Sequence, residues 1–246
     1  MDLGISGKRA AVAASSGGLG LGVARALAQA GCRVVVNGRD PDRLADAAAT
    51  VDGAVTVPGD VGTEAGAVAF VDAATEALGG IDILVTNAGG PPAGTFATTP
   101  LDAYPGALEL NLLASIAMCH RVVPGMREQR WGRVLAITSI SVRQPIENLI
   151  LSNTARAGLT GFLKTLATEV APDGVTVNSL QPGLHATDRL RSLGTDLDRL
   201  AQTVPTRTVG DPDDFGRVAA FLCSDAAKFI TGAAIPVDGG SHRGLQ

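Results

Sequence analysis

The sequence has few aromatic residues, no excess of basic residues and no long apolar run. Only 3% of its 246 residues are aromatic, and the formal net charge is −4. This low net charge and a hydrophobic content of 46% exclude an intrinsically disordered chain. Without a basic excess to meet phosphates, we expect no nucleic-acid partner. No apolar run approaches the roughly 18 residues that cross a bilayer, so we expect no membrane span.

Cysteine and histidine are also scarce, and neither forms a ligand or disulfide pattern. Cys32, Cys119 and Cys223 are widely spaced, which predicts reduced core thiols in a cytoplasmic protein. Pairs of His or Cys at metal-binding spacing are absent from the sequence, so we predict no metal site. His120 and His242 show no partner pattern and are interpreted as structural or exposed. The first residues have neither the basic start nor the apolar core of a signal peptide.

Short apolar runs alternate with longer helical stretches along the chain. Several runs are rich in Val, Ile, Leu and Ala without polar alternation, which is typical of strands buried on both faces of a parallel sheet. The predicted strands are Arg9–Ala13, Arg33–Asn37, Ala54–Val57, Ile81–Thr86, Arg133–Thr138, Val175–Leu180 and Ala233–Val237. The predicted helices are Leu19–Ala30, Pro41–Thr50, Thr63–Leu78, Asp102–Gln129, Ser152–Ala171 and Asp211–Ser224. The alternation predicts an α/β fold, a single Rossmann-like doubly wound domain over residues 1–246 with a parallel seven-stranded sheet flanked by helices.

Two stretches depart from this regular alternation. The helix predicted over 102–129 contains Pro105 and Pro124 and is expected to be bent or broken. Residues 186–208 are polar and irregular, and they lie between the last two predicted strands. We interpret this segment as a substrate loop or lid over a site, with an ordinary surface loop as the alternative.

A glycine-rich loop, Ala14–Gly22, joins the first predicted strand to the first predicted helix. Glycine lets the backbone approach a pyrophosphate closely, and the N-terminus of the following helix offers unpaired N–H groups. The alternative is a tight strand–helix turn without a ligand. Because the loop opens an alternating sheet, it favours a dinucleotide site. The residues expected to contact the cofactor there are Ser15, Ser16, Gly18, Leu19 and Gly20.

The tip of the second predicted strand, Asn37-Gly38-Arg39, favours NADP(H) over NAD(H). Sites for NAD place an acidic side chain near this tip, whereas sites for NADP place an arginine near the 2′-phosphate. Here Arg39 is suited to the phosphate, and Asp40 is expected to cap the following helix. A solvated surface charge is the alternative for Arg39. We therefore predict NADP(H), with Asn37 and Arg39 among its contacts.

With these features the chain resembles the short-chain dehydrogenase/reductase family, of the type that includes 3-oxoacyl-carrier-protein reductases. The resemblance covers nearly the whole chain. The family motif Thr-Gly-x-x-x-Gly-x-Gly aligns with residues 13–20, where Gly18 and Gly20 match and Ala14 replaces the first glycine. The other matching residues are Asp60-Val61, Asn87-Ala88-Gly89, Asn111, Ser139, Pro182-Gly183 with Thr187, and Val237-Asp238-Gly239-Gly240.

The resemblance also implies a role for these residues. Asp60 and Val61 are expected at the adenine, and Asn87, Ala88 and Gly89 at the cofactor. Asn111 is expected to hold a water of a proton relay, and Ser139 to be the catalytic serine. Pro182, Gly183 and Thr187 are expected beside the nicotinamide. The family further implies a small-molecule substrate and a homotetramer (or homodimer) in which helices 102–129 and 152–171 pair between subunits.

The central catalytic pair of the family is replaced in this chain. In register with Ser139 and with the downstream residues 161–167, the family's Tyr-x-x-x-Lys falls on Ser152 and Arg156. A serine hydroxyl is far less acidic than a phenol with a pKa of about 10, and a guanidinium does not release its proton near neutral pH. Arg156 keeps the positive charge and is expected to bind the nicotinamide ribose. The proton donor is left open between Ser152, His185 and a water.

His185 is the titratable side chain nearest to the expected nicotinamide turn. It follows Pro182-Gly183-Leu184, and an imidazole titrates near neutral pH. The alternative is a loop histidine that faces solvent or bonds the backbone. Tyr104, the single tyrosine, is interpreted as structural, and Arg143 and Glu147 as surface charges.

The sequence thus favours an NADP(H)-dependent oxidoreductase that acts on a carbonyl or alcohol with an altered proton donor. Loss of the Tyr and Lys pair leaves two alternatives open. One is a catalytically inactive cofactor-binding or partner protein, and the other is a non-redox dehydratase or isomerase on the same scaffold. The substrate is not identified, because its pocket is expected from the variable segments 90–99, 141–151 and 186–208.

Overall fold

The structure is a computed structural model that describes residues 2–191 and 196–245. Its centre is a seven-stranded sheet in the order β3-β2-β1-β4-β5-β6-β7, in which every neighbouring pair is parallel. The strands are β1 (Arg9–Val12), β2 (Arg33–Gly38), β3 (Val55–Pro58), β4 (Ile83–Thr86), β5 (Gly132–Ile137), β6 (Val175–Pro182) and β7 (Ala234–Val237). The predicted parallel seven-stranded sheet is confirmed.

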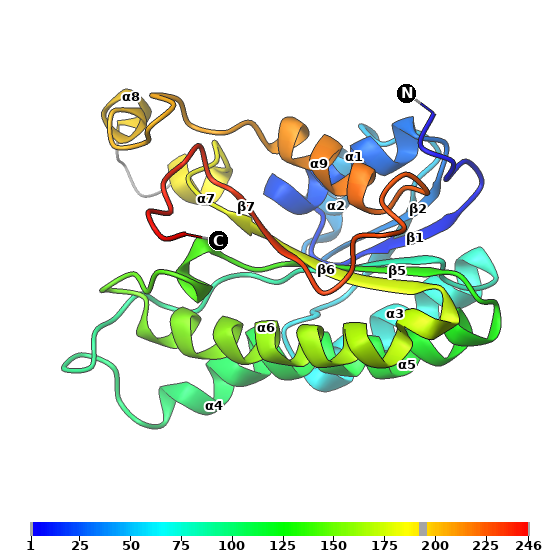
Figure 1. Ribbon diagram of the computed structural model, residues 1–246, viewed down its shortest axis with the longest axis horizontal. Helices are drawn as coiled ribbons and strands as arrows, with labels where there is room; N and C mark the ends of the chain where they lie inside the picture. Colours follow the sequence, from blue (N-terminus) through cyan, green and yellow to red (C-terminus); the bar gives the residue numbers. More distant parts are fainter. Residues whose placement is uncertain (1, 192–195, 246) are drawn as a thin grey trace.

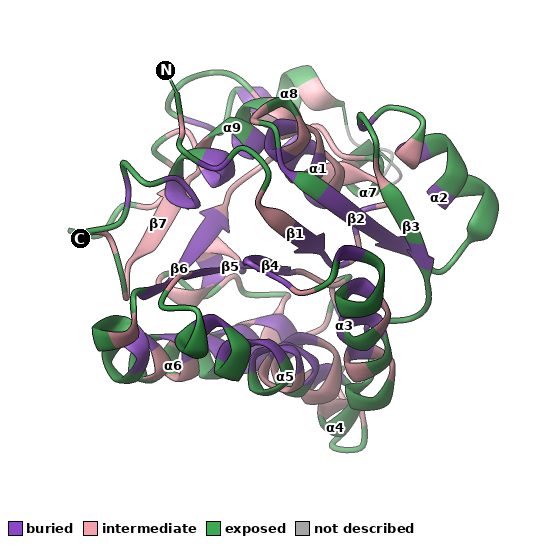
Figure 2. Ribbon diagram, turned by 90° about the vertical axis from the view of Figure 1, so that its right-hand side faces the viewer, coloured by how far each residue is buried: buried purple, intermediate pink, exposed green. Residues whose placement is uncertain are grey.

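Helices cover both faces of the sheet and give a three-layered molecule (Figure 2). The layer on one face contains α1 (Gly18–Gln29), α2 (Pro41–Ala48) and α9 (Pro212–Leu222). The opposite layer contains α3 (Glu64–Leu78), α4 (Ala103–Leu108), α5 (Ala114–Glu128) and α6 (Ile150–Val170) (Figure 1). The central strands are buried between these layers, because their apolar side chains enter a separate core cluster on each face.

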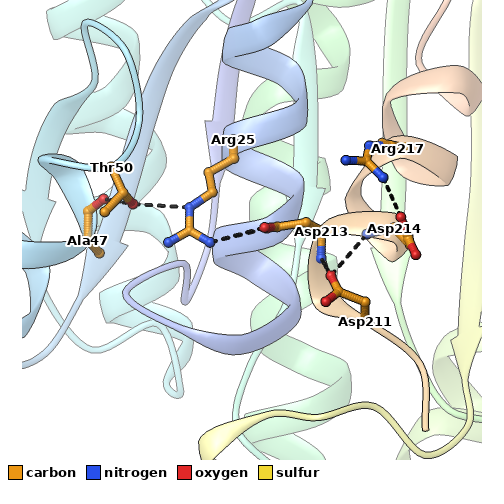
Figure 3. Close-up of polar contacts among 7 residues, drawn as sticks. All are labelled: Arg25, Ala47, Thr50, Asp211, Asp213, Asp214 and Arg217. Carbon is orange, nitrogen blue, oxygen red and sulfur yellow. Dashed lines mark hydrogen bonds and ion pairs between the residues drawn. The ribbon is translucent and has the colours of Figure 1, made fainter. Parts of the chain in front are cut away.

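The helix that follows the glycine loop is held tightly against α9. A Cβ on Gly22 would lie 2.0 Å from a backbone oxygen of α9, and one on Gly216 would lie 2.1 Å from a backbone oxygen of α1. Both glycines are therefore required for this close helix packing. Arg25 adds a polar clamp, since it bonds Asp213 at 3.1 Å on one side and Thr50 at 3.1 Å on the other (Figure 3). This clamp ties the second half of α1 to the start of α9 and to the end of the α2 segment.

The long helix predicted over 102–129 is interrupted, but its prolines do not end it. Pro124 lies inside α5, and the register changes instead in a π-helical turn, η1 (Glu109–Leu113), which contains Asn111. The continuous run Ala103–Glu128 meets the length and hydropathy of a membrane span. It is nevertheless a core helix here, because Met118 and Cys119 pack in the core beneath the sheet.

The segment predicted as an irregular loop contains short helices. These are α7 (Asp188–Arg191) and α8 (Leu197–Ala201), while residues 192–195 of the predicted lid lie outside the described part of the chain. The predicted cap Asp40 is confirmed, since its side chain accepts hydrogen bonds from the N–H groups of Asp42 and Arg43. A 3-10 turn, η2 (Ile140–Val142), follows β5, and another, η3 (Ala171–Asp173), follows α6.

Candidate functional site

The loop between β1 and α1 is braced by two buried polar side chains. The Asn37 amide oxygen accepts from the N–H of Ala14 at 3.0 Å, and the Ser15 hydroxyl donates to the carbonyl of Val12 at 2.7 Å. Both side chains are fully buried. Ala14 stands where the family has glycine and takes a left-handed φ of 46°. The loop therefore keeps the glycine-type turn although a methyl group has been added.

A cavity of about 710 Å³ opens above this loop at the carboxyl ends of β1, β2 and β4. Many residues predicted for the cofactor line it, namely Ser16, Gly18, Leu19, Asn37, Arg39, Asp60, Val61, Asn87, Ala88, Gly89 and Thr187. The structure places the remaining predicted contacts, Ser15, Gly20, Arg156, Pro182 and Gly183, outside this lining. Gly20 is required for the shape of the loop, because a Cβ there would lie 2.6 Å from the carbonyl oxygen of Ala14.

Three arginines reach this cavity, although only one of them was predicted. Arg39 is exposed and lies 3.7 Å from Asp60, while Arg43 on α2 lies 3.3 Å from Asp188 on α7. Arg189, the next residue of α7, lines the cavity from the opposite side. Arg43 was missed because it reads as an ordinary charge on an exposed helix face. Arg39 precedes the N-cap of α2, so the four-residue spacing between Arg39 and Arg43 is not a helical repeat and gave no signal.

The deep end of the cavity is shaped by two asparagines. Asn87 donates to the carbonyl of Ala14 at 3.1 Å, which ties β4 to the glycine loop. Asn111 donates to the carbonyl of Gly89 at 2.8 Å from the η1 turn. The amide oxygen of Asn111 is buried and has no hydrogen-bond partner. An acceptor of this kind is costly to leave unpaired, so it is suited to hold a water or a ligand group.

Other buried polar atoms without partners gather at the same edge of the sheet. Among the described residues they include the hydroxyls of Thr86 and Ser141 and both amide atoms of Gln181. Thr86 ends β4, Ser141 follows β5 and Gln181 lies near the end of β6. Carboxyl ends of parallel strands are where open α/β sheets bind ligands. Gln181 was not singled out from the sequence.

Two of the residues predicted for catalysis, Ser139 and Arg156, lie at the end of β5. The Ser139 hydroxyl accepts from the N–H of Ser141 at 3.1 Å, which leaves its proton available for donation. Ser152 and Arg156 lie one turn apart on α6, and both are buried. Arg156 donates to the carbonyls of Ile137 and Thr138 at 3.0 and 3.1 Å. Burial, with a smaller effect of the Arg189 charge, lowers the pKa of Arg156 to about 10.

His185 lies apart from this group. Its ring packs edge-on against Phe215 with centroids 5.2 Å apart, and Nδ1 lies 3.2 Å from the carbonyl of Gly183. It lines a separate small cavity with Asp211 and Asp214 rather than the large one. Burial lowers the pKa of His185. The described geometry thus places the imidazole against α9, in the backbone-bonded arrangement that was the alternative to a proton donor.

The residues present fit a dinucleotide. The glycine loop offers backbone N–H groups next to a roomy cavity, and Thr187 packs against Gly18, where a Cβ would lie 3.3 Å from its methyl group. Segments from β1, β2, β4 and β6 therefore converge on one elongated site. Among the described residues no cluster of His, Cys, Asp and Glu could hold a metal ion.

Comparison with known proteins adds relatives over the full length of the chain. A sequence profile described as "Enoyl-(Acyl carrier protein) reductase" matches residues 13–242. "Dehydrogenase/reductase SDR family member 4" of Homo sapiens is 36% identical over 245 residues, covering 96% of this chain and 88% of that protein. Acetoacetyl-CoA reductase of Shinella zoogloeoides is 33% identical over 233 residues, covering 94% and 97%. The structure of L-sorbose reductase from Gluconobacter frateurii, complexed with NADPH and L-sorbose, is 34% identical with a TM-score of 0.93 and full coverage of both chains.

Proposed function

Because this chain belongs to the short-chain dehydrogenase/reductase family, we propose that it is an NADP(H)-dependent oxidoreductase acting on a carbonyl or alcohol. The observation that carries the proposal is the cavity itself, which extends from the glycine loop to Gly89, where Asn111 bonds the backbone. Ser139 follows β5, the strand next to β4 in the sheet. We expect a small-molecule substrate next to the part of this cavity that Asn87 and Gly89 line.

The arrangement around β2 supports NADP(H) rather than NAD(H). Ser16 lies against Gly38, where a Cβ would be 2.6 Å from its hydroxyl, and Arg39 follows at once. Arg39 and Arg43 bring two guanidinium groups to this end of the cavity, and such groups bind phosphate strongly. Asp40 is used as a helix cap. Of the two carboxylates that line this end of the cavity, Asp40 is thus engaged by the N–H groups of α2, and Asp60 lies 3.7 Å from Arg39.

In the proposed reaction the protein's own groups handle the oxygen of the substrate. The nicotinamide, when bound, supplies or accepts the hydride. Ser139 donates its hydroxyl proton in a hydrogen bond to the carbonyl oxygen, and the nearby Arg156 cation stabilises negative charge that develops there. The alkoxide takes its proton from Ser152 or from a water held at the Asn111 amide oxygen. His185 is left as a structural residue.

The test is turnover by the purified protein with NADPH and a panel of ketones, 3-oxoacyl thioesters, quinones and imines, followed by absorbance. Ser139→Ala is expected to lower kcat by about 100-fold or more, as loss of an oxyanion donor does. Thr154→Ala is the matched control, because this exposed hydroxyl bonds only within α6. Wild-type activity in the Ser139 variant, or no NADPH binding by calorimetry, contradicts the proposal.

A catalytically inactive cofactor-binding protein is the second candidate. It is favoured by one observation, that neither Ser152 nor Arg156 titrates near neutral pH in the way a catalytic acid does. It predicts NADPH binding without turnover on any compound of the panel. A dehydratase or isomerase on the same scaffold would change substrate without oxidising NADPH.

We further propose that residues 1–246 form one NAD(P)-binding domain that works in the cytoplasm as a homotetramer (or homodimer). An apolar groove of about 510 Å³ between α5 and α6, lined among others by Val123, Phe162 and Leu166, supports helix pairing between subunits. The three cysteines are free and buried, as suits a reducing compartment. A monomer in light scattering contradicts the assembly.

A further inference from the structure

His185 lies where the chain leaves β6 and turns toward the large cavity. Its carbonyl accepts a hydrogen bond from the N–H of Thr187 at 2.7 Å. The Thr187 methyl group would lie 3.3 Å from a Cβ on Gly18 of the glycine loop. Thr187 and the next two residues, Asp188 and Arg189, line the large cavity. A displacement of His185 would therefore reach the wall of the cofactor site within two residues.

The imidazole of His185 is buried and is enclosed on three sides. Nδ1 lies 3.2 Å from the carbonyl of Gly183 in the expected nicotinamide turn, and the ring packs edge-on against Phe215 of α9. On the third side is Gly210, where a Cβ would lie 2.8 Å from Nε2. The backbone of Gly210 also bonds the residues on either side of His185 at 2.9 Å. The ring thus links the nicotinamide turn to the start of α9.

Three carboxylates share a small cavity of about 170 Å³ with this ring. Asp211 and Asp214 come from the start of α9, and Asp238 follows β7. Each carboxylate has partners already, since Asp211 caps α9, Asp214 pairs with Arg217 and Asp238 accepts from two N–H groups of the C-terminal tail. The described lining of this cavity contains no Lys or Arg. An imidazolium here would compete for carboxylates that hold α9 and the tail.

The folded arrangement favours the neutral imidazole. Burial lowers the pKa of His185 by more than the Gly183 carbonyl and the nearby carboxylates raise it. Protonation therefore favours a conformation in which the ring is better hydrated. Such a conformation gives up the contacts with Gly183 and Phe215, and the fixed position of Thr187 is lost with them.

We propose that His185 is a pH-sensitive positioning residue, which holds the nicotinamide turn and Thr187 in place for NADPH only while its imidazole is neutral. This inference rests on the proposed function. On acidification the imidazole takes up one proton, its ring leaves Gly183 and Phe215, and NADPH binds more weakly. Binding of NADPH in turn releases that proton, because the two equilibria are linked.

The first test is the Kd for NADPH, measured by calorimetry at about pH 7.5 and about pH 5.5, on either side of the usual titration of an imidazole. A phosphate monoester also titrates near pH 6, so the wild type is compared with His185→Gln, whose side chain does not titrate. We expect the Kd to rise at least about threefold more in the wild type, with a ceiling of about tenfold per pH unit for one linked proton. The matched control is His120→Gln, an exposed position on α5, which should behave as the wild type.

The second test follows His185 itself and does not depend on a variant at this position. The chain has three histidines, whose Cε1–H signals are followed by NMR as the pH is changed. Substitution of His120 and His242 by glutamine, one at a time, assigns their signals and leaves that of His185. We expect the His185 signal to titrate about half a pH unit lower in the NADPH complex than in the free protein, which corresponds to the threefold change in affinity.

The outcomes separate this inference from the proposed function. Equal pH dependence of NADPH binding in the wild type and in His185→Gln overturns the inference and leaves the proposed function intact. A His185 signal that titrates at the same pH with and without NADPH does the same. If the wild type does not bind NADPH even at the higher pH, the proposed function fails, and the inference fails with it.

Discussion

Replacement of Arg156 by methionine is expected to stabilise the folded protein. The side chain is only 8% exposed, and burial, with a smaller effect of the Arg189 charge, lowers its pKa by more than two units to about 10. Since one pKa unit corresponds to about 1.4 kcal/mol, the buried charge costs the folded state roughly 3 kcal/mol near neutral pH. The variant also loses the hydrogen bonds to Ile137 and Thr138, which contribute roughly 1 kcal/mol each.

The net expectation is a gain of about 1 kcal/mol in the free energy of unfolding, measured by urea titration near neutral pH. Above the folded-state pKa of about 10 and below the higher pKa of an arginine in the unfolded chain, the unfolded wild type binds more protons. Wild-type stability therefore rises with pH in this window, and the advantage of the variant shrinks. Arg156→Lys keeps a cation and should show no gain. A methionine variant less stable than the wild type by about 1 kcal/mol would refute the reasoning, because the guanidinium would then be favourable overall.

Three further predictions concern the cofactor, the pH response and helix packing. Arg39→Ala should raise the Kd for NADPH by about tenfold in calorimetry and leave the Kd for NADH unchanged. The control Arg217→Ala on α9 should change neither Kd. An equal loss of affinity for both nucleotides contradicts the assignment of Arg39 to the 2′-phosphate. Because the pKa of His185 is lowered, the unfolded chain takes up more protons than the folded protein below about pH 6.5, so stability falls on acidification. His185→Gln should therefore make the urea midpoint less dependent on pH between about pH 7 and pH 5. An unaltered pH dependence contradicts this role of His185. Gly22→Ala places a Cβ 2.0 Å from a backbone oxygen of α9 and should lower the free energy of unfolding by about 3 kcal/mol or more. Gly106→Ala has open space around it and should raise the free energy of unfolding by up to about 1 kcal/mol. Similar effects of the two substitutions would contradict the packing argument.

Much of the fold could be predicted because local patterns determine it. Strand β5 is buried along its whole length, and the apolar residues that follow Arg133 in it could be read directly as a central parallel strand. Caps such as Asp40 and Thr63 act through their own neighbouring backbone, so they also appear in the sequence. The η1 turn could not be predicted, since residues 109–113 have an ordinary helical pattern. Its wider turn is visible only when Asn111 is seen to bond Gly89.

In the candidate site, too, the sequence predicts local backbone features but not the directions of side chains. The glycine loop was found because glycine has a distinctive backbone role, and the structure puts it at a cavity. The direction of a side chain is not fixed by its place in the sequence, so His185 follows the expected nicotinamide turn and yet packs on Phe215. Arg189 lies two residues beyond Thr187, and nothing in its sequence context distinguishes it from a solvated charge. Its position became significant only through contact with Gly90.

The energetic cost of Arg156 bears on the choice between an enzyme and an inactive relative. A buried cation without an acidic partner weakens the fold, and an apolar residue of similar size would remove that cost. If the protein only holds a cofactor, Arg156→Met should be more stable and should bind NADPH as the wild type does. If the charge stabilises the developing alkoxide, the same variant should be more stable and lose turnover. Joint measurement of unfolding, NADPH binding and turnover on this one substitution therefore separates the two candidates, because only the enzyme shows gain of stability together with loss of catalysis.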